Sequence, residues 1–236
     1  MVKFLRQKVN VLQERGVTLR WFRVAWNDPE ARDALLLSLK AAFAATAIAL
    51  VLGTMAAVAI SRFQFFGREI FSFLLILPLA LPGVITGIAL SSFFTFGGVN
   101  FSLWTIVVGH ATFCVVIVYN NVLARLRRTS PSLIEASMDL GADGFQTFVH
   151  VTLPAISTAL ISGALLAFAL SFDEVIVTTF TAGVQNTLPI WIFGNIRLGQ
   201  KLPEVNVVVF LILLATIIPV ALAQRLTRES GILRTE

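Results

Sequence analysis

Charged residues are scarce in this chain. Only 13% of its 236 residues are Asp, Glu, Lys or Arg, whereas 57% are hydrophobic, and the mean hydropathy is +0.86. Soluble globular domains usually contain about 25% charged residues, so the composition excludes that class. The apolar runs are continuous and do not alternate with polar residues, which favours helices over a barrel. The sequence therefore predicts an all-α, polytopic membrane protein.

Cysteine and phosphate-binding motifs are lacking as well. The single cysteine, Cys114, lies inside an apolar run, which excludes a disulfide framework and a cysteine-based metal site. No Gly-x4-Gly-Lys-Ser/Thr motif is present, so no ATP hydrolysis by this chain is expected. Residues 1–26 have no apolar core of the kind found in secretory signal peptides. The net charge of +5 is interpreted as a topology signal beside membrane spans, and no nucleic-acid binding is expected.

Five apolar runs reach the length of about 20 residues that roughly 30 Å of hydrocarbon requires. They lie at residues 34–60, 70–96, 102–123, 157–180 and 204–224. The second run contains Pro78, Pro82 and Gly83, so a kinked or discontinuous helix is expected there. The predicted transmembrane domain thus covers residues 34–224.

Basic residues between the runs indicate the orientation. Arg62 and Arg68 follow the first run, and three further arginines follow the third. Because loops rich in Lys and Arg stay inside, segments 61–69 and 124–156 and the tail 225–236 are predicted to be cytoplasmic.

The N-terminal segment 1–33 conflicts with this orientation. With five spans it must be extracytoplasmic or interfacial, although it carries seven basic residues. A further helix preceding this chain would resolve the conflict and is the favoured interpretation; the alternative is an amphipathic helix on the cytoplasmic surface. Trp21 and Trp26 are typical of interfacial anchors, and Asp28 is expected to cap a helix that begins near Pro29.

The longest polar piece on the predicted cytoplasmic side spans residues 129–156. Ser130 is typical of a helix start, Gly141 of a helix end, and residues 144–151 predict a second short helix before Pro154. The second helix has an apolar side that a solvated loop does not need. These features favour an element that docks on a partner over a plain linker.

A specific family pattern lies within this segment. The order Glu135-Ala136-Ser137, three residues, Gly141, nine residues, Val151, one residue, Leu153-Pro154 resembles the EAA loop of binding-protein-dependent ABC importer permeases. Ser stands here for the second Ala and Val for Ile, and both substitutions preserve size. The stretches "LPLALPGVITGIAL" and "FALSFDEVIVTTFTAG" look like those of spermidine/putrescine permeases. The resemblance implies the type I ABC importer fold, usually of six helices, with the first one missing from this chain.

The resemblance also implies roles for residues of the loop, which in this family enters a groove on a cytoplasmic ATPase. The residues expected to couple to the ATPase are Glu135, Ala136, Ser137, Asp139, Gly141, Ala142, Phe148, Val151, Leu153 and Pro154. The implied partners are an ATPase dimer that binds ATP and Mg²⁺, a second homologous permease, an extracytoplasmic substrate-binding protein and the lipids of the bacterial inner membrane. This chain would itself bind no cofactor and have no catalytic or metal site.

Two adjacent carboxylates, Asp173 and Glu174, lie within the fourth apolar run. A charge at the centre of a membrane helix costs about 2.5–3.5 kcal/mol. One hypothesis is that they contact a cationic substrate such as a polyamine during transport; the equal alternative is a structural ion pair or a helix cap. Another small solute, such as an opine or amino-acid derivative, is the second candidate cargo. A proton-coupled carrier is a rival, but it predicts inverted repeats that the sequence does not show.

Two further features of the runs suggest packing. His110 and Asn120-Asn121 in the third run are weaker candidates for contact with the substrate, and a lone histidine within a membrane run is expected instead to satisfy a hydrogen bond between helices. Small residues at Ala42, Ala45, Ala49 and Gly53 recur at helical spacing and favour close helix contacts, either within the subunit or against a second permease.

Overall fold

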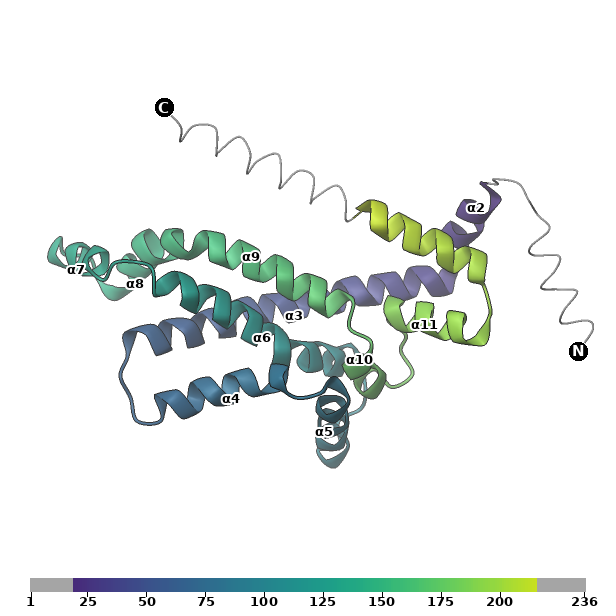
Figure 1. The fold of residues 1–236 in the computed structure, drawn as a ribbon, viewed down its shortest axis with the longest axis horizontal. Helices are drawn as coiled ribbons and strands as arrows, with labels where there is room; N and C mark the ends of the chain where they lie inside the picture. The colour runs from purple at the N-terminus through teal and green to yellow at the C-terminus, as the bar shows by residue number, and fades with distance from the viewer. Residues whose placement is uncertain (1–18, 216–236) are drawn as a thin grey trace, which may run out of the picture. The chain divides into compact units, whose positions relative to one another are not determined.

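The computed structural model describes residues 19–215, and that part of the chain is helical with no strand (Figure 1). Two compact units are present. The larger comprises Asp33–Trp191, and the smaller joins the described parts of Met1–Arg32 and Ile192–Glu236. The prediction of an all-α protein is confirmed.

The larger unit contains the helices that are long enough to span a membrane. Its elements are α3 (Pro29–Arg62, of which the first turn belongs to the smaller unit), α4 (Arg68–Ala80), α5 (Gly83–Phe96), α6 (Leu103–Leu126), α7 (Ser132–Asp139), α8 (Gly144–Thr147), the π-helical turn η1 (Phe148–Thr152), α9 (Leu153–Phe172), α10 (Ile176–Thr181) and the start of α11 (Leu188–Leu198). By length and composition, α3, α6 and the continuous stretch Gly144–Phe172 qualify as spans. Counting the bent pair α4 and α5 gives up to four within the described residues.

Helix α6 forms the centre of the larger unit. Val116, Val118 and Tyr119 are almost completely buried there, and α9, α10 and α4 pack around this helix. The predicted small-residue stripe of α3 is also buried, and a Cβ added to Gly53 would lie 2.9 Å from the carbonyl oxygen of Val115 in α6. At Gly53 the stripe therefore packs against a helix of the same chain.

The second apolar run is broken, as predicted. Helices α4 and α5 meet at an angle of 106°. Leu81 is extended, with ψ of 143°, because the ring of Pro82 disfavours a helical conformation for the preceding residue. Helix α5 then begins at Gly83.

The fourth apolar run differs from the prediction of a single span over 157–180. Its helix starts earlier, continues from α8 through η1 into α9, and ends at Phe172. After a break at residues 173–175 the chain forms α10 as a separate short helix. The prediction was wrong because the break contains neither Pro nor Gly and depends on contacts from other helices. Helix α11 was not predicted either.

The smaller unit contains α2 (Arg20–Asn27), the first turn of α3, the end of α11 and the helix Leu202–Ala215. The predicted cap of α3 is confirmed, because Asp28 Oδ1 accepts a hydrogen bond of 2.9 Å from the backbone N–H of Glu30. The helix Leu202–Ala215 begins two residues before the predicted run 204–224, whose end lies outside the described residues. The predicted tail 225–236 also lies outside them, and the predicted sidedness stays a prediction.

Candidate functional site

The polar segment forms two short helices joined by a tight turn. Helix α7 ends in a Schellman motif: the N–H of Ala142 donates to the carbonyl of Ser137, and the N–H of Gly141 donates to that of Met138. Gly141 has φ of +88°, a conformation that residues with a Cβ rarely adopt. The glycine predicted from the family pattern is therefore required by the backbone of this turn.

The second short helix is capped and tied to the first. Asp143 Oδ1 accepts from the N–H of Gln146 at 2.8 Å, and Gln146 Oε1 accepts from the N–H of Asp143 at 3.0 Å, which completes a capping box. The hydroxyl oxygens of Ser137 and Thr147 lie 3.1 Å apart, and Thr147 is fully buried. Ser137 thus has a structural reason to be small and polar, because it links α7 to α8.

The second helix continues directly into the membrane span. Between α8 and α9 the chain widens into the π-turn η1, in which the N–H of Leu153 donates to the carbonyl of Phe148, five residues earlier. Pro154 has no N–H to donate, and its ring crowds the preceding turn, so a wider turn at this point is physically reasonable. The pieces α8, η1 and α9 form one continuous helical rod with a local irregularity.

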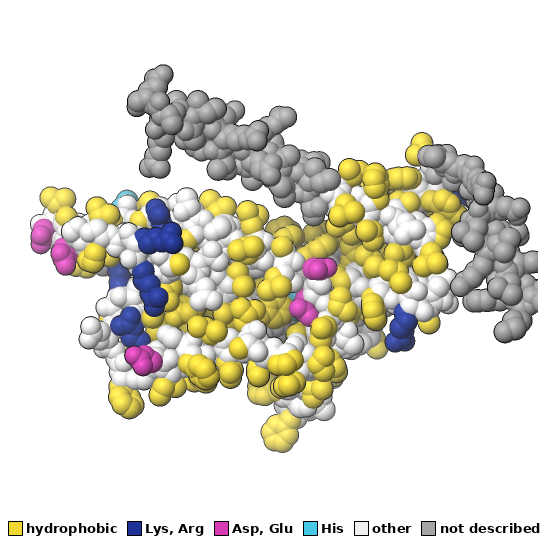
Figure 2. All heavy atoms as spheres, viewed as in Figure 1, with side chains coloured by type: hydrophobic (Ala, Val, Ile, Leu, Met, Phe, Trp, Pro, Cys, Tyr) yellow, Lys and Arg dark blue, Asp and Glu magenta, His cyan; other side chains and the backbone are white. Residues whose placement is uncertain are grey.

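Hydrophobic side chains are exposed at the tip of this segment. Leu140 is 89% exposed, Phe145 76% and Met138 50%. Glu135 and Asp139 are exposed on the same helix, α7. Figure 2 shows acidic and hydrophobic side chains at this end of the larger unit, with Lys and Arg side chains close behind them, where α3 and α6 end and α4 begins. We define the tip as residues 135–148.

Sequence reasoning missed Leu140 and Met138 as candidate contact residues. Leu140 lies next to the glycine of the Schellman motif, and a large apolar residue in a solvated turn is the signal that would have found it. Of the predicted residues, Ala136 is exposed and Ala142 and Phe148 are partly buried within the tip. Leu153 and Pro154 are exposed at the start of α9.

A cavity of about 440 Å³ lies between this segment and the ends of two spans. Glu135 and Val151 line it from the segment, and Arg62 and Leu126 line it from the ends of α3 and α6. The predicted coupling residues therefore do not form one surface, because some point outward at the tip and others point towards the spans.

The break between α9 and α10 is held by His110 of α6. Its Nδ1 lies 2.7 Å from Ser171 Oγ and its Nε2 lies 2.8 Å from Thr178 Oγ1, and all three side chains are buried. The hydroxyl of Thr178 donates to the carbonyl of Glu174, so its oxygen accepts from Nε2 of His110, while Nδ1 shares a hydrogen bond with Ser171. The expectation that His110 satisfies contacts between helices is confirmed.

The two carboxylates lie in this break and differ in their surroundings. Glu174 Oε1 accepts a hydrogen bond of 2.9 Å from the N–H of Val177, which caps the first turn of α10. Asp173 follows the last residue of α9 as its C-cap, is exposed, and has no ion-pair partner among residues 19–215. Figure 2 shows acidic side chains in the middle of a mainly hydrophobic face, where α9 and α10 meet. Because Glu174 is engaged in capping α10, Asp173 is the carboxylate whose oxygens are more available to a cation.

The two helix breaks of the larger unit lie against each other. A Cβ added to Gly83, at the start of α5, would lie 3.5 Å from Ile176 at the start of α10. One turn later, a Cβ on Gly87 would lie only 2.5 Å from the ring of Phe180. Glycine at these positions lets α5 and α10 approach closely, which brings irregular backbone from both broken runs to one place. Within the described residues no cluster of His, Cys, Asp or Glu is placed to hold a metal ion.

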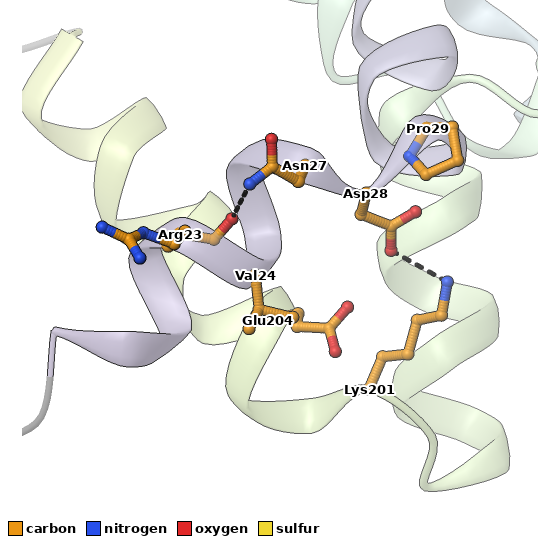
Figure 3. Close-up of a pocket in the computed structure, with 7 residues that line it drawn as sticks. All are labelled: Arg23, Val24, Asn27, Asp28, Pro29, Lys201 and Glu204. Atoms are coloured by element: carbon orange, nitrogen blue, oxygen red, sulfur yellow. Dashed lines mark hydrogen bonds and ion pairs between the residues drawn. The ribbon is translucent and has the colours of Figure 1, made fainter.

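An ion-pair cluster lies in the smaller unit (Figure 3). Lys201 Nζ is 2.8 Å from Asp28 Oδ2 and 2.7 Å from Glu30 Oε2, beside a cavity of about 510 Å³. These hydrogen bonds raise the pKa of Lys201 above its usual value. Burial alone would raise the pKa of Asp28, but the hydrogen bonds from Lys201 and from the Glu30 backbone lower it. Lys201 also has φ of +45°, a backbone conformation that residues with a Cβ rarely adopt.

Comparison with known proteins identifies the relatives of this chain. The family model of the binding-protein-dependent transport system inner membrane component matches residues 49–228. The chain is 39% identical over 206 residues to the putrescine transport system permease protein PotI of Escherichia coli (strain K12), covering 84% of this chain and 73% of that protein. It is 30% identical over 221 residues to the spermidine/putrescine transport system permease protein PotC of Haemophilus influenzae, covering 93% and 86%.

A third relative is named for a different substrate. The chain is 31% identical over 223 residues to the putative 2-aminoethylphosphonate transport system permease protein PhnV of Salmonella paratyphi A, covering 91% of this chain and 83% of that protein. The predicted resemblance to spermidine/putrescine permeases and the predicted multi-pass location in the inner membrane are confirmed. The chain therefore belongs to the family of binding-protein-dependent transport system inner membrane components and is a permease subunit of an ABC importer.

Proposed function

We propose that this permease subunit imports polyamines and is driven by ATP hydrolysis on partner subunits. Two ATPases bind ATP and Mg²⁺, a second homologous permease completes the path, and an extracytoplasmic binding protein delivers the cargo. This chain binds no cofactor and hydrolyses no ATP. The observation that carries the proposal is the tip at residues 135–148, which exposes Leu140 and Phe145 and continues as one helical rod into α9.

The tip has the chemistry of a docking element. Exposed apolar side chains beside exposed carboxylates suit a groove that is apolar at its centre and basic at its rim. Because α8, η1 and α9 are continuous, displacement of the tip also displaces a membrane span. Closure of the ATPases would move the tip, and the spans would alternate between inward-facing and outward-facing states.

The cargo proposal rests on the break at Asp173 and on the relatives named for putrescine and spermidine. A polyamine that leaves water needs acceptors for its ammonium groups, and an exposed carboxylate beside irregular backbone provides one. The relative named for 2-aminoethylphosphonate supports a second candidate, a small organic solute that also carries an ammonium group. A proton-coupled carrier stays a weaker rival, since it gives no role to the tip.

The proposal is tested with the whole complex purified through this chain. Asp139→Lys places a cation on an exposed part of the tip, where the groove is proposed to be basic, and Gly141→Pro disrupts the turn at φ of +88°. Both variants are expected to lose co-purifying ATPase, whereas Ser130→Ala, an exposed change just before α7, is expected to keep it. Full retention of ATPase and of uptake in both variants would refute the docking role.

The cargo and the energy source are tested by uptake into proteoliposomes. Labelled putrescine and labelled 2-aminoethylphosphonate are supplied with the binding protein and ATP, and a proton uncoupler is added in a parallel arm. We expect putrescine uptake that survives the uncoupler and falls about tenfold or more in the double variant Asp173→Asn, Glu174→Gln, which corresponds to about 1.4 kcal/mol. Uptake abolished by the uncoupler while ATP is maintained would favour the proton-coupled rival.

A further inference from the structure

The last residue of α3 is bound to the rod that leads from the tip into α9. Arg62 Nη2 donates a hydrogen bond to Thr152 Oγ1, across 90 positions of sequence. Thr152 is the last residue of the π-turn and is only 2% exposed. Nε of Arg62 is buried and has no hydrogen-bond partner among residues 19–215, so Thr152 is the side chain that holds this guanidinium in place.

A second arginine binds the same rod from α6. Arg125 Nε donates a hydrogen bond of 2.8 Å to the carbonyl oxygen of Ala155, in the first turn of α9. A carbonyl oxygen has two lone pairs, so this bond does not require the helical bond of Ala155 to be broken. Charged donors make stronger hydrogen bonds than neutral ones, which suits contacts that must resist displacement.

These two bonds lie beside the cavity of about 440 Å³ that separates the tip from the ends of the spans. Ser61, Arg62 and Phe63 line it from the end of α3, while Ile134 and Met138 line it from α7. Open space at this place would let α7 shift without moving the spans, because few side chains there transmit the displacement. The two arginine bonds do not involve α7, because they join the π-turn and the first turn of α9 directly to the ends of α3 and α6.

We propose that Arg62 and Arg125 are positioning residues that fasten the π-turn and the start of α9 to the ends of α3 and α6. When the ATPases displace the tip, three spans then move together and the cavity does not absorb the motion. This inference rests on the proposed docking function of the tip. Arg62 lies at the end of an apolar run, where an arginine is ordinarily explained as a topology signal. Here it has the second role of holding the rod.

The test measures uptake of labelled putrescine per ATP hydrolysed by the complete reconstituted complex. Thr152→Val removes the acceptor at nearly constant volume, Thr152→Ser keeps it, and Arg62→Met removes the donor. Thr152→Val and Arg62→Met are expected to retain the ATPases and their hydrolysis but to lower uptake per ATP about fivefold or more, the lower end of ordinary coupling between sites. Thr152→Ser is expected to behave as the parent.

The double variant Arg62→Met, Thr152→Val is expected to be no worse than either single variant, because both remove one contact. Arg128→Met, which removes an exposed arginine just after α6, is the matched control and keeps the parent ratio. Unchanged uptake per ATP in Thr152→Val, or equal losses in Thr152→Ser and Thr152→Val, would overturn the proposal even if Arg62→Met does not assemble. A failure of the proposed docking function is measured separately, because in that case the Gly141→Pro variant would keep its co-purifying ATPase.

Discussion

The two helix breaks of the larger unit arise in different ways. The break between α4 and α5 is encoded locally, because Pro82 forces Leu81 into an extended conformation and Gly83 starts the next helix. The break between α9 and α10 has no Pro or Gly at residues 173–175 and is held by His110 from another helix. The position of a break that depends on contacts from distant residues cannot be predicted from the local sequence.

The difference also separates their expected roles. A proline break stays in place whatever its neighbours do, whereas a break held by hydrogen bonds responds when those neighbours move. The second break also carries Asp173 and Glu174, the carboxylates proposed to contact cargo. It is therefore the better place for a path that opens and closes.

The largest effect is expected from removing the side chain that holds the second break. His110→Leu deletes both hydrogen bonds and leaves Ser171 Oγ and Thr178 Oγ1 buried without this partner. We expect a loss of about 2–4 kcal/mol in the free energy of unfolding, measured by thermal unfolding of the purified protein. The exposed His150→Leu serves as the control, with a change of less than about 0.5 kcal/mol. If the His110→Leu and His150→Leu variants were equally stable, the claim that contacts of His110 hold this break would be wrong.

The next effect concerns the contact between the two breaks. Gly87→Ala places a Cβ 2.5 Å from Cδ2 of Phe180, so the ring must shift. Overpacking of this kind costs about 1–3 kcal/mol. Gly194→Ala, where no atom lies within 4 Å of the added Cβ, is the matched control and is expected to stabilise by about 0.4–1 kcal/mol. If Gly87→Ala were as stable as the control, close approach of α5 and α10 would be ruled out.

A smaller effect is expected at the first break. Pro82→Ala relieves the local restriction on Leu81, but Gly83 and Gly87 still pack against α10. The change should cost about 1 kcal/mol or less, mainly through greater entropy of the unfolded chain. Thermal unfolding measures the stability, and a pair of spin labels in α4 and α5 measures whether the bend persists. Because the first break is encoded locally, the pair is expected to straighten. A bend that persists unchanged would show that the contacts of Gly83 and Gly87 with α10 maintain it without Pro82.

The smallest effect is expected at the partly exposed ion pair of the smaller unit, which lies outside both breaks. Lys201→Met should cost about 1 kcal/mol or less at neutral pH. The pKa of Asp28 is lowered, so its contribution is present above its usual value of 3.8 and is lost as the pH falls through the folded value. The pKa of Lys201 is raised above 10.5, so its contribution is lost only at more alkaline pH. Glu204 lines the same cavity, and its pKa is raised mainly by burial. The stability difference from the parent should thus be constant only around neutral pH, above the titration of these carboxylates and below that of Lys201. A difference that varied across this range would contradict the assignment.

Much of this fold follows from the sequence because membrane spans are local properties. Run length located α3 and α6 within a few residues, and the cap at Asp28 and the turn at Gly141 follow from side-chain and backbone preferences. The family pattern placed Glu135 and Pro154 in the segment that the structure shows as two short helices and a rod.

The rest depends on contacts that no local pattern contains. The end of α9 at Phe172 depends on His110, 61 positions before Ser171. The π-turn that joins α8 to α9 was not predicted, because Pro154 is compatible with either a new helix or a widened turn. The bond between Arg62 and Thr152 was equally hidden, since arginines at the ends of apolar runs are already explained by membrane topology.

The docking role of the tip is tested most directly by the amount of ATPase that co-purifies with charged variants of its exposed apolar residues. Leu140→Asp and Phe145→Asp alter side chains that are 89% and 76% exposed, so neither should disturb the permease itself. Phe66→Asp, in the turn between α3 and α4 and fully exposed, is the matched control. We predict that both tip variants lose the ATPase while the Phe66 variant keeps it. Full retention of the ATPase by both tip variants would contradict the account.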